Sequence, residues 1–236
     1  MTQIKCKACN DSGWERTERD GREFLKKCKC QRLEILKDKC LSANIPQKFA
    51  GLMIQSFGTE NGDPSLLRLV KIANSFIERY PVGKGIILHG QTGMGKTHLL
   101  CTIATEILKK FPRTDIFYID WNDMVREMKS GESHTFRDFS VINNTIERMS
   151  KADLLIMDEL GASLPSQWVR DNIYYIINYR YNRQKMTLFA TNYFDETADG
   201  SPTLRERVGD RVRSRIFEMA ESFNLAGIDY RHKYKD

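Results

Sequence analysis

The sequence contains no long hydrophobic run. No apolar stretch approaches the length of about 20 residues that a membrane-spanning helix requires. The segment Met1–Cys6 also lacks the apolar core of a secretion signal. We therefore expect a cytoplasmic protein without membrane contact, whose cysteines are reduced. Internal repeats and low-complexity tracts are absent as well, so the chain is not a repeat protein.

Neither sign of charge dominates the composition. The 37 basic and 31 acidic residues give a formal net charge of +6, which is compatible with a nucleic-acid partner. The alternative is a basic surface whose charges are scattered and solvated. Hydrophobic residues make up 41% and charged residues 29% of the 236 positions. This balance is typical of a globular protein with one substantial core and a small appendage.

One stretch follows the phosphate-binding loop pattern G-x-x-x-x-G-K-T. It consists of Gly90, Gln91, Thr92, Gly93, Met94, Gly95, Lys96 and Thr97, followed by His98. An apolar strand at 85–89 precedes it and a helix at 97–110 follows, as the chemistry requires. Glycines let the main chain approach a triphosphate, Lys96 would neutralise its phosphates and Thr97 would bind Mg²⁺. A chance glycine-rich turn is the alternative.

Two further strands carry polar residues at their ends. In the predicted strand at 153–157, the four apolar residues 154–157 run into Asp158 and Glu159, the Walker B pattern. Asp158 would hold Mg²⁺ and Glu159 would act as the general base toward the attacking water. Asn192 ends the predicted strand at 186–192 and could sense the γ-phosphate through its amide. The alternatives are surface acids at a strand end and an ordinary turn asparagine.

Four of the six cysteines lie near the N-terminus: Cys6 and Cys9, then Cys28 and Cys30. Between these pairs, Asp20–Gly21 indicates a hairpin turn. Two cysteine pairs at the ends of a hairpin are typical of a zinc ribbon, in which four thiolates bind one Zn²⁺. Cys40 could replace one ligand, and structural or redox cysteines are the alternative. Cys101 fits a core position.

The remaining pattern predicts helices and a domain boundary. The loop 58–64 is rich in turn residues and separates a segment 1–60 from a segment 61–236. Near the C-terminus we expect one basic helix over 204–219, with Arg207, Arg211 and Arg215 on one face. These arginines either form a solvated surface or reach the ATP of a neighbouring subunit. Predicted strands are 85–89, 115–119, 153–157, 186–192 and 222–225, and predicted helices are 31–40, 65–80, 97–110, 121–129, 140–149, 167–184 and 204–219.

These motifs resemble the bacterial replicative-helicase loaders of the DnaC/DnaI type, relatives of the IstB transposition helper ATPases. The resemblance rests on residues 90–99, 154–161, 190–192 and 209–216, and it covers about residue 45 to the C-terminus. The cysteine-bearing N-terminus also resembles loaders that carry a zinc-binding, helicase-contacting domain.

The resemblance implies an α/β AAA+ P-loop NTPase with a central parallel five-stranded sheet flanked by helices. It assigns Arg215 as an arginine finger acting in trans and Arg231 as a second sensor. Because only eleven residues follow Leu225, we expect the C-terminal helical lid to be absent. The family also binds single-stranded DNA in the centre of an ATP-dependent oligomer. The matching segments assign DNA contacts to Phe136, Arg137, Phe139, Trp168 and Arg170, whose aromatics could instead be core residues.

The expected function is therefore that of an ATPase that uses ATP, Mg²⁺ and Zn²⁺ and loads a replicative hexameric helicase onto single-stranded DNA. The nearest alternative is a transposition helper that binds duplex DNA and a transposase. A small-molecule phosphotransferase and a non-hydrolysing zinc adaptor are further alternatives, and the complete set of Lys96, Thr97, Asp158 and Glu159 argues against the latter.

Overall fold

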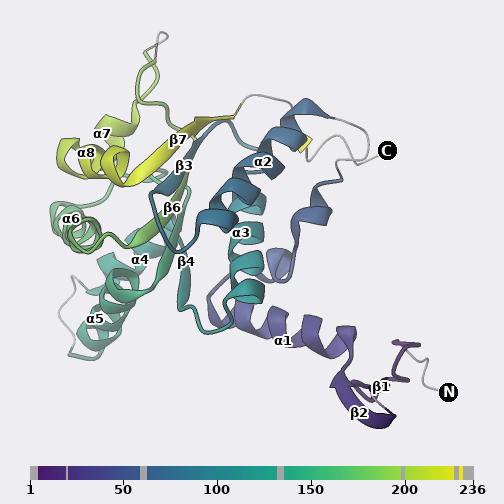
Figure 1. The fold of residues 1–236 in the computed structure, drawn as a ribbon. Helices are drawn as coiled ribbons and strands as arrows, with labels where there is room; N and C mark the ends of the chain where they lie inside the picture. Colours follow the sequence, from purple (N-terminus) through teal and green to yellow (C-terminus); the bar gives the residue numbers. More distant parts are fainter. Residues whose placement is uncertain are drawn as a thin grey trace.

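A five-stranded sheet lies between two groups of helices, and a small N-terminal hairpin extends away from it (Figure 1). This arrangement is that of a computed structural model of the chain. The structure describes residues 5–19, 21–58, 63–131, 136–197, 200–225 and 229–230.

All strands of the central sheet are parallel. They are β3 (Gly85–His89), β4 (Ile116–Asp120), β5 (Leu154–Asp158), β6 (Met186–Thr191) and β7 (Ala220–Asn224), in the order β4-β5-β6-β3-β7. β3, β5 and β6 are buried along their whole length, which explains their almost continuous apolar sequences. The five predicted strands are confirmed, and their carboxyl ends meet at one edge of the sheet.

Helices cover both faces of this sheet. They are α1 (Lys29–Ser42), α2 (Pro64–Arg79), α3 (Lys96–Lys110), α4 (Trp121–Gly131), α5 (Phe136–Lys151), α6 (Gln167–Asn182), α7 (Leu204–Val208) and α8 (Asp210–Met219), with the short 3₁₀ helices η1 (Gln47–Phe49) and η2 (Ile54–Phe57). None of the helices in the described ranges is both long and apolar enough to cross a bilayer.

The period-two alternation of β5 shows how the two faces are built. Leu154 and Ile156 point into a cluster with residues of α1, α2 and α3. Leu155 and Met157 point into a second cluster, with residues of α4, α5, α6, α7 and α8. In Figure 1 these helix groups lie on opposite sides of the sheet.

The N-terminal hairpin is joined to the core through α1. Its strands β1 (Trp14–Arg19) and β2 (Arg22–Lys27) are antiparallel, and Arg19 pairs with Arg22 across the predicted turn. The second half of α1 packs on α3, where Leu36 and Cys40 belong to the main core. The domain boundary near residue 60 stays a prediction.

The predicted continuous helix over 204–219 is wrong. Gly209 has a φ of 84° and a ψ of 155° and separates α7 from α8, because an extended residue with positive φ cannot continue a right-handed helix. The apolar stripe is nevertheless confirmed, since Leu204, Val208, Val212 and Ile216 are all buried. Arg207 therefore does not share a helix face with Arg211 and Arg215.

At the edge of the sheet where the strands begin, the buried Arg180 connects α6 to the end of α5 and to the start of β6. Arg180 on α6 is 0% exposed. Its Nε donates to Thr187 Oγ1 at 2.9 Å, and Nη1 donates to the carbonyls of Met149 and Ala152 at 2.9 and 2.8 Å. Nη2 donates to the Met186 carbonyl at 2.6 Å. These bonds satisfy the end of α5 and the start of β6, where the main chain is cut off from water.

We expect Arg180→Met to destabilise the protein strongly. The substitution keeps much of the volume but leaves several buried carbonyls without a donor, so the free energy of unfolding should fall by about 3 kcal/mol or more. Urea denaturation measures this change. Arg183→Ala, on an exposed arginine at the end of the same helix, is the matched control and should stay within about 0.5 kcal/mol. Equal effects of the two variants would contradict this role of Arg180.

Candidate functional site

The phosphate loop connects the end of β3 to the start of α3. Gly93 and Gly95 have φ values of 87° and 80°, a conformation that residues with a Cβ rarely adopt. A Cβ on Gly93 would also lie 2.0 Å from Asp229 Oδ1, so a side chain there would require the Asp229 carboxylate to move. The loop thus needs glycine at these positions, and its N–H groups and the start of α3 provide an anion-binding cradle.

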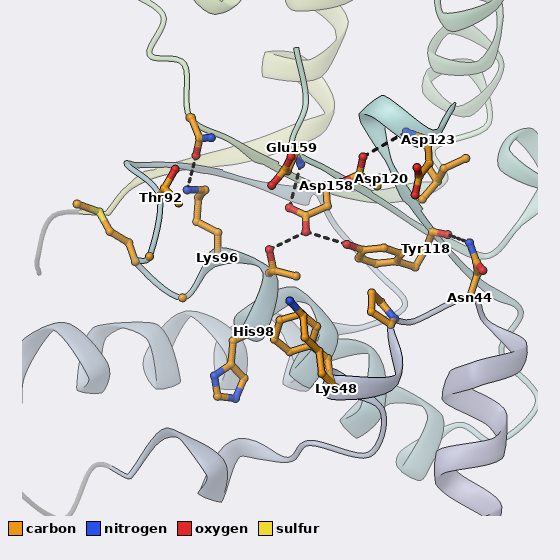
Figure 2. Close-up of a pocket in the computed structure, with 18 of the residues that line it drawn as sticks. Asn44, Lys48, Thr92, Lys96, His98, Tyr118, Asp120, Asp123, Asp158 and Glu159 are labelled. Atoms are coloured by element: carbon orange, nitrogen blue, oxygen red, sulfur yellow. Dashed lines mark hydrogen bonds between the residues drawn. The ribbon is translucent and has the colours of Figure 1, made fainter. Parts of the chain in front are cut away.

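Lys96 lies inside this cradle. Its side chain is buried, and Nζ donates to the carbonyls of Gly90 and Gln91 at 2.6 and 2.8 Å. The same ammonium donates to Asn192 Oδ1 at 2.7 Å (Figure 2). The predicted phosphate-binding lysine and the predicted sensor amide are therefore in direct contact.

The two predicted magnesium ligands also meet. Thr97 Oγ1 donates to Asp158 Oδ2 at 2.6 Å, and Asp158 is 2% exposed. Hydroxyl and carboxylate oxygens are the ligands that Mg²⁺ prefers, so this pair fits a magnesium site. Tyr118 OH donates to the same carboxylate oxygen at 2.8 Å. Burial, together with the Asp158 charge, raises the pKa of Tyr118 well above its usual range, so the phenol remains a donor.

Glu159 has a left-handed backbone, with φ at 52°, at the first position after β5. Its N–H donates to Asp158 Oδ1 at 2.9 Å. The carboxylate is solvent-exposed and accepts from Asn122 Nδ2 at 3.4 Å. Positive φ in a non-glycine residue is uncommon and concentrates at functional sites. Glu159 is therefore directed differently from the buried Asp158, as separate roles for the two acids require.

These groups line one cavity of about 810 Å³. Its wall includes loop residues 92–97 together with His98, Asp158, Glu159 and Asn192 (Figure 2). A volume of this size accommodates a ligand as large as a nucleotide. The structure thus brings Lys96, Thr97, Asp158, Glu159 and Asn192 together in one place.

Several cavity residues were missed from the sequence. Asp120 ends β4 and is the register partner of Asp158 in the sheet. Burial raises its pKa above the ordinary value. A strand ending in an acid was a usable signal for Asp120. No sequence motif marks Tyr118, Asn44 or Lys48 as cavity residues. Tyr118 lines the cavity because β4 pairs with β5, whereas Asn44 and Lys48 belong to the connector after α1.

His98 lies on the cavity side of α3. Its ring stacks on Phe57 with centroids 4.3 Å apart, and Nε2 lies 2.7 Å from Ser56 Oγ. Burial lowers the pKa of His98, so the imidazole is neutral at neutral pH. His98 therefore lines the cavity with an uncharged polar side chain. Its contacts with Ser56 and Phe57 also connect η2 to α3.

The other predicted contacts lie outside this cavity or outside the described residues. Arg215 does not line it: Nε donates to Asn178 Oδ1 at 2.9 Å and the guanidinium stacks on Tyr174. Trp168, in the first turn of α6, packs partly against the core, and Arg170 Nε donates to the Pro165 carbonyl at 3.3 Å. Phe136, Arg137 and Phe139 belong to α5, but their side chains and all of Arg231 are outside the described residues.

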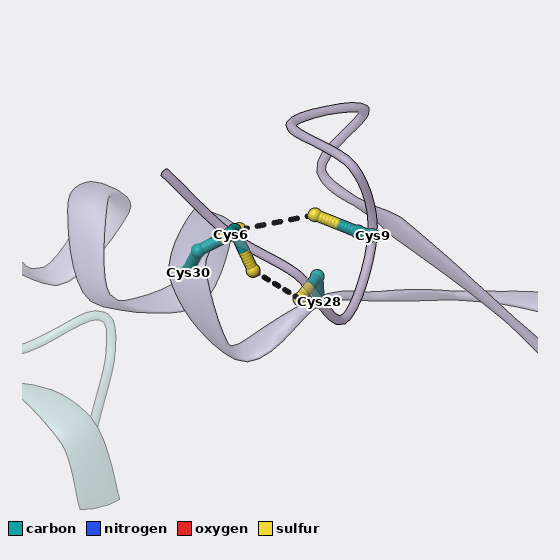
Figure 3. Close-up of side chains that lie close together, drawn as sticks. All are labelled: Cys6, Cys9, Cys28 and Cys30. Carbon is teal, nitrogen blue, oxygen red and sulfur yellow. Dashed lines mark hydrogen bonds between the residues drawn. The ribbon is translucent and has the colours of Figure 1, made fainter. Parts of the chain in front are cut away.

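The four N-terminal cysteines form a candidate metal centre (Figure 3). Their sulfurs all lie within 4.8 Å of one another. The Cys6–Cys28 and Cys9–Cys30 sulfur distances are 3.8 and 3.5 Å. Sulfurs bound tetrahedrally to one Zn²⁺ at about 2.3 Å would lie about 3.8 Å apart, so the cluster fits zinc.

The two cysteine pairs are held by local structure. Asp11 accepts the N–H groups of Lys5 and Cys6 at 3.0 and 2.7 Å, which shapes the first pair. Cys28 is the extended N-cap of α1 and Cys30 lies in its first turn, which explains the short spacing of the second pair.

The remaining two cysteines do not belong to this cluster. Cys40 is fully buried, and its sulfur lies 3.4 Å from Thr105 Oγ1. The alternative that Cys40 replaces one metal ligand is therefore wrong. Cys101 lies in the core, as predicted.

Several known proteins are similar to this chain in sequence. The profile of the IstB-like ATP-binding proteins matches residues 55–236. The replicative helicase loader DnaI of Bacillus subtilis (strain 168) is 27% identical over 201 residues, which are 81% of this chain and 62% of DnaI. The phage-like element PBSX protein XkdC of the same organism is 25% identical over 232 residues, covering 94% of this chain and 82% of XkdC.

A solved structure is also similar to this chain. The crystal structure of the DnaC helicase loader is similar with a TM-score of 0.61 and 27% identity, over 77% of this chain and 100% of that chain. The predicted AAA+ fold and the resemblance to DnaC/DnaI-type loaders are thus confirmed. The chain nevertheless spans less than two thirds of the length of DnaI. Because the profile match covers more than half of the sequence, the chain belongs to the family of IstB-like ATP-binding proteins.

Proposed function

We propose that this chain is an ATP-hydrolysing loader that places a replicative ring helicase onto single-stranded DNA. One observation carries the enzymatic part: a single cavity contains the phosphate loop, the Thr97–Asp158 pair and the exposed Glu159. Membership of an ATP-binding family and the likeness to DnaI and DnaC support the loader part.

The residues would divide the work as follows. Lys96 and the loop N–H groups would hold the triphosphate, and Asn192 would read its terminal phosphate; the hydrogen bond between Lys96 and Asn192 supports this pairing of roles. Mg²⁺, bound by Thr97 and Asp158, would neutralise charge on the phosphate oxygens. Glu159 orients the attacking water and accepts its proton. Arg215 of a neighbouring protomer would offset charge on the transferring group, because Arg215 does not line its own cavity.

The N-terminal part would provide the partner contact. In this assignment residues 1–60 bind zinc through Cys6, Cys9, Cys28 and Cys30 and contact the hexameric helicase, and residues 61–236 form the ATPase domain. The second sensor Arg231 and the DNA contacts Phe136, Arg137, Phe139, Trp168 and Arg170 remain part of the proposal. ATP and single-stranded DNA would stabilise an oligomer of this chain.

The second candidate function is a transposition helper that binds duplex DNA and a transposase. The description of the matching family as IstB-like favours it. The four-cysteine cluster precedes the matched residues and favours the loader. The form of DNA that stimulates ATP hydrolysis distinguishes the two.

We expect Lys96→Ala to abolish nucleotide binding and Glu159→Gln to bind ATP but to lower turnover by about 100-fold or more. The first variant removes the buried cation of the cradle, whereas the second removes only the proton acceptor. Isothermal titration with ATP and a phosphate-release assay measure the two effects. Normal turnover by Glu159→Gln would show that another group is the general base.

Removal of a cluster cysteine should release the metal without affecting the ATPase. We expect Cys28→Ser to lose bound zinc and helicase capture, while hydrolysis without DNA continues, because the cluster lies outside the nucleotide cavity. Elemental analysis and a pull-down with a hexameric helicase are the measurements. Cys40→Ala is the matched control and should retain zinc. Equal zinc content in both variants would contradict the assignment.

The DNA contact is tested on α5. We expect Phe136→Ala to weaken single-strand binding about tenfold, because one base loses its stacking partner. Fluorescence anisotropy with single-stranded and duplex oligonucleotides at low salt measures the affinities. Unchanged single-strand affinity would remove Phe136 from the site, and stimulation of hydrolysis by duplex DNA alone would favour the transposition helper.

A further inference from the structure

Two arginines of the α7–α8 pair are directed inward, toward the loops that carry the catalytic groups. These loops, here called the catalytic loops, are residues 159–162 after β5 and 192–195 after β6. The first contains Glu159 and the second begins with Asn192. Both loops are bonded to the same helix pair that presents Arg215.

Arg207 on α7 binds the first catalytic loop. Its Nε and Nη2 donate to the carbonyls of Gly161 and Ala162, both at 2.7 Å. A Cβ on Gly161 would lie 2.9 Å from Arg207 Cβ, so the helix and the loop are in close contact. The guanidinium also lies over the ring of Tyr193, 4.7 Å from its centroid. Arg207 thus contacts both catalytic loops.

Arg213 on α8 binds the second catalytic loop. Its Nε and Nη2 donate to the two carboxylate oxygens of Asp195 in a bidentate, partly buried pair. This pairing holds the pKa of Asp195 below its ordinary value. The Leu204 N–H donates to the Phe194 carbonyl at 2.8 Å, so the start of α7 is bonded to the same loop.

The first catalytic loop is also bonded to the last residue of β6, and the second is bonded to the last residue of β3, which precedes the phosphate loop. Thr191 Oγ1 donates to the Leu160 carbonyl at 2.8 Å. The buried His89, which directly precedes the phosphate loop, lies with Nδ1 2.9 Å from the Tyr193 carbonyl. Burial lowers the pKa of His89, so the neutral ring donates this bond. Asn192 is therefore followed directly by residues that are bonded to His89, α7 and α8.

Arg215 lies on another side of α8. Residues two apart in a helix do not share a face, and Arg215 stacks on Tyr174 while Arg213 reaches Asp195. On one side, α8 is thus bonded to the second catalytic loop, which begins with the predicted sensor Asn192. On another side, the same short helix carries Arg215, the predicted arginine finger.

We propose that Arg207 and Arg213 are positioning residues that couple occupancy of a protomer's own nucleotide site to the presentation of Arg215 to its neighbour. A terminal phosphate at Asn192 would reset the loop 192–195, and the Arg213–Asp195 pair would carry this change to α8. This inference rests on the proposed function for the role of Arg215, but the coupling within one protomer is measurable without it.

Hydrogen–deuterium exchange of α8 with and without a non-hydrolysable ATP analogue and Mg²⁺ tests the coupling. In the Arg215→Ala background, which suppresses assembly through the finger, we expect the analogue to slow exchange of residues 210–219 about fivefold or more. Adding Arg213→Lys or Asp195→Asn should reduce this effect to about twofold or less, because a bidentate ion pair is lost in each. Nucleotide affinity, measured on the same samples, should remain close to that of the parent.

Arg205→Lys is the matched control. Arg205 pairs with Asp210 within the exposed α7–α8 turn rather than with either catalytic loop, so the analogue effect should persist. A purely structural role of Arg213 would change exchange equally with and without the analogue. An analogue effect on α8 that survives both Arg213→Lys and Asp195→Asn, or its absence in the parent at saturation, would overturn the coupling. Failure of the analogue to bind at all would instead contradict the proposed ATPase.

Discussion

The hydrogen bond between Thr97 and Asp158 is the contact on which the site depends. It joins the start of α3 to the end of β5. Because the Asp158 carboxylate is buried away from water, it needs hydrogen-bond donors from the protein. Asp158 receives further bonds from Tyr118 OH and from the Glu159 N–H. The separation between the phosphate loop and the acidic strand end is therefore fixed by the protein itself. Lys96 and Asn192 add a second link across the same edge of the sheet.

The N-terminal part is connected to this edge through main-chain contacts. The Tyr118 N–H donates to the Ala43 carbonyl at 2.8 Å, and Asn44 Nδ2 donates to the Tyr118 carbonyl at 3.0 Å. The segment that leaves α1 is thus bonded to the residue whose hydroxyl binds Asp158. The cysteine cluster, α1 and the Thr97–Asp158 pair form a continuous series of packed and bonded elements.

The strands and the phosphate-loop helix could be predicted because their signals are local. The buried runs ending in His89, Asp158 and Asn192 define strands, and the glycine spacing defines the loop between them. The break at Gly209 was missed, because the apolar stripe continues with helical spacing on both sides of it. Tyr118 lies beside Asp158 only because β4 pairs with β5 in this register. The sequence of a single strand does not reveal which residues of another strand it pairs with, so Tyr118 could not be predicted.

The central claim is that a magnesium triphosphate binds between Lys96 and the Asp158–Glu159 pair. A crystal structure with a non-hydrolysable ATP analogue and Mg²⁺ tests it most directly. We predict that the terminal phosphate contacts both Lys96 and Asn192, and that the ion binds Thr97 Oγ1 with Asp158 in its first or second coordination sphere. An analogue bound elsewhere, or phosphates that contact neither Lys96 nor the loop N–H groups, would contradict the account.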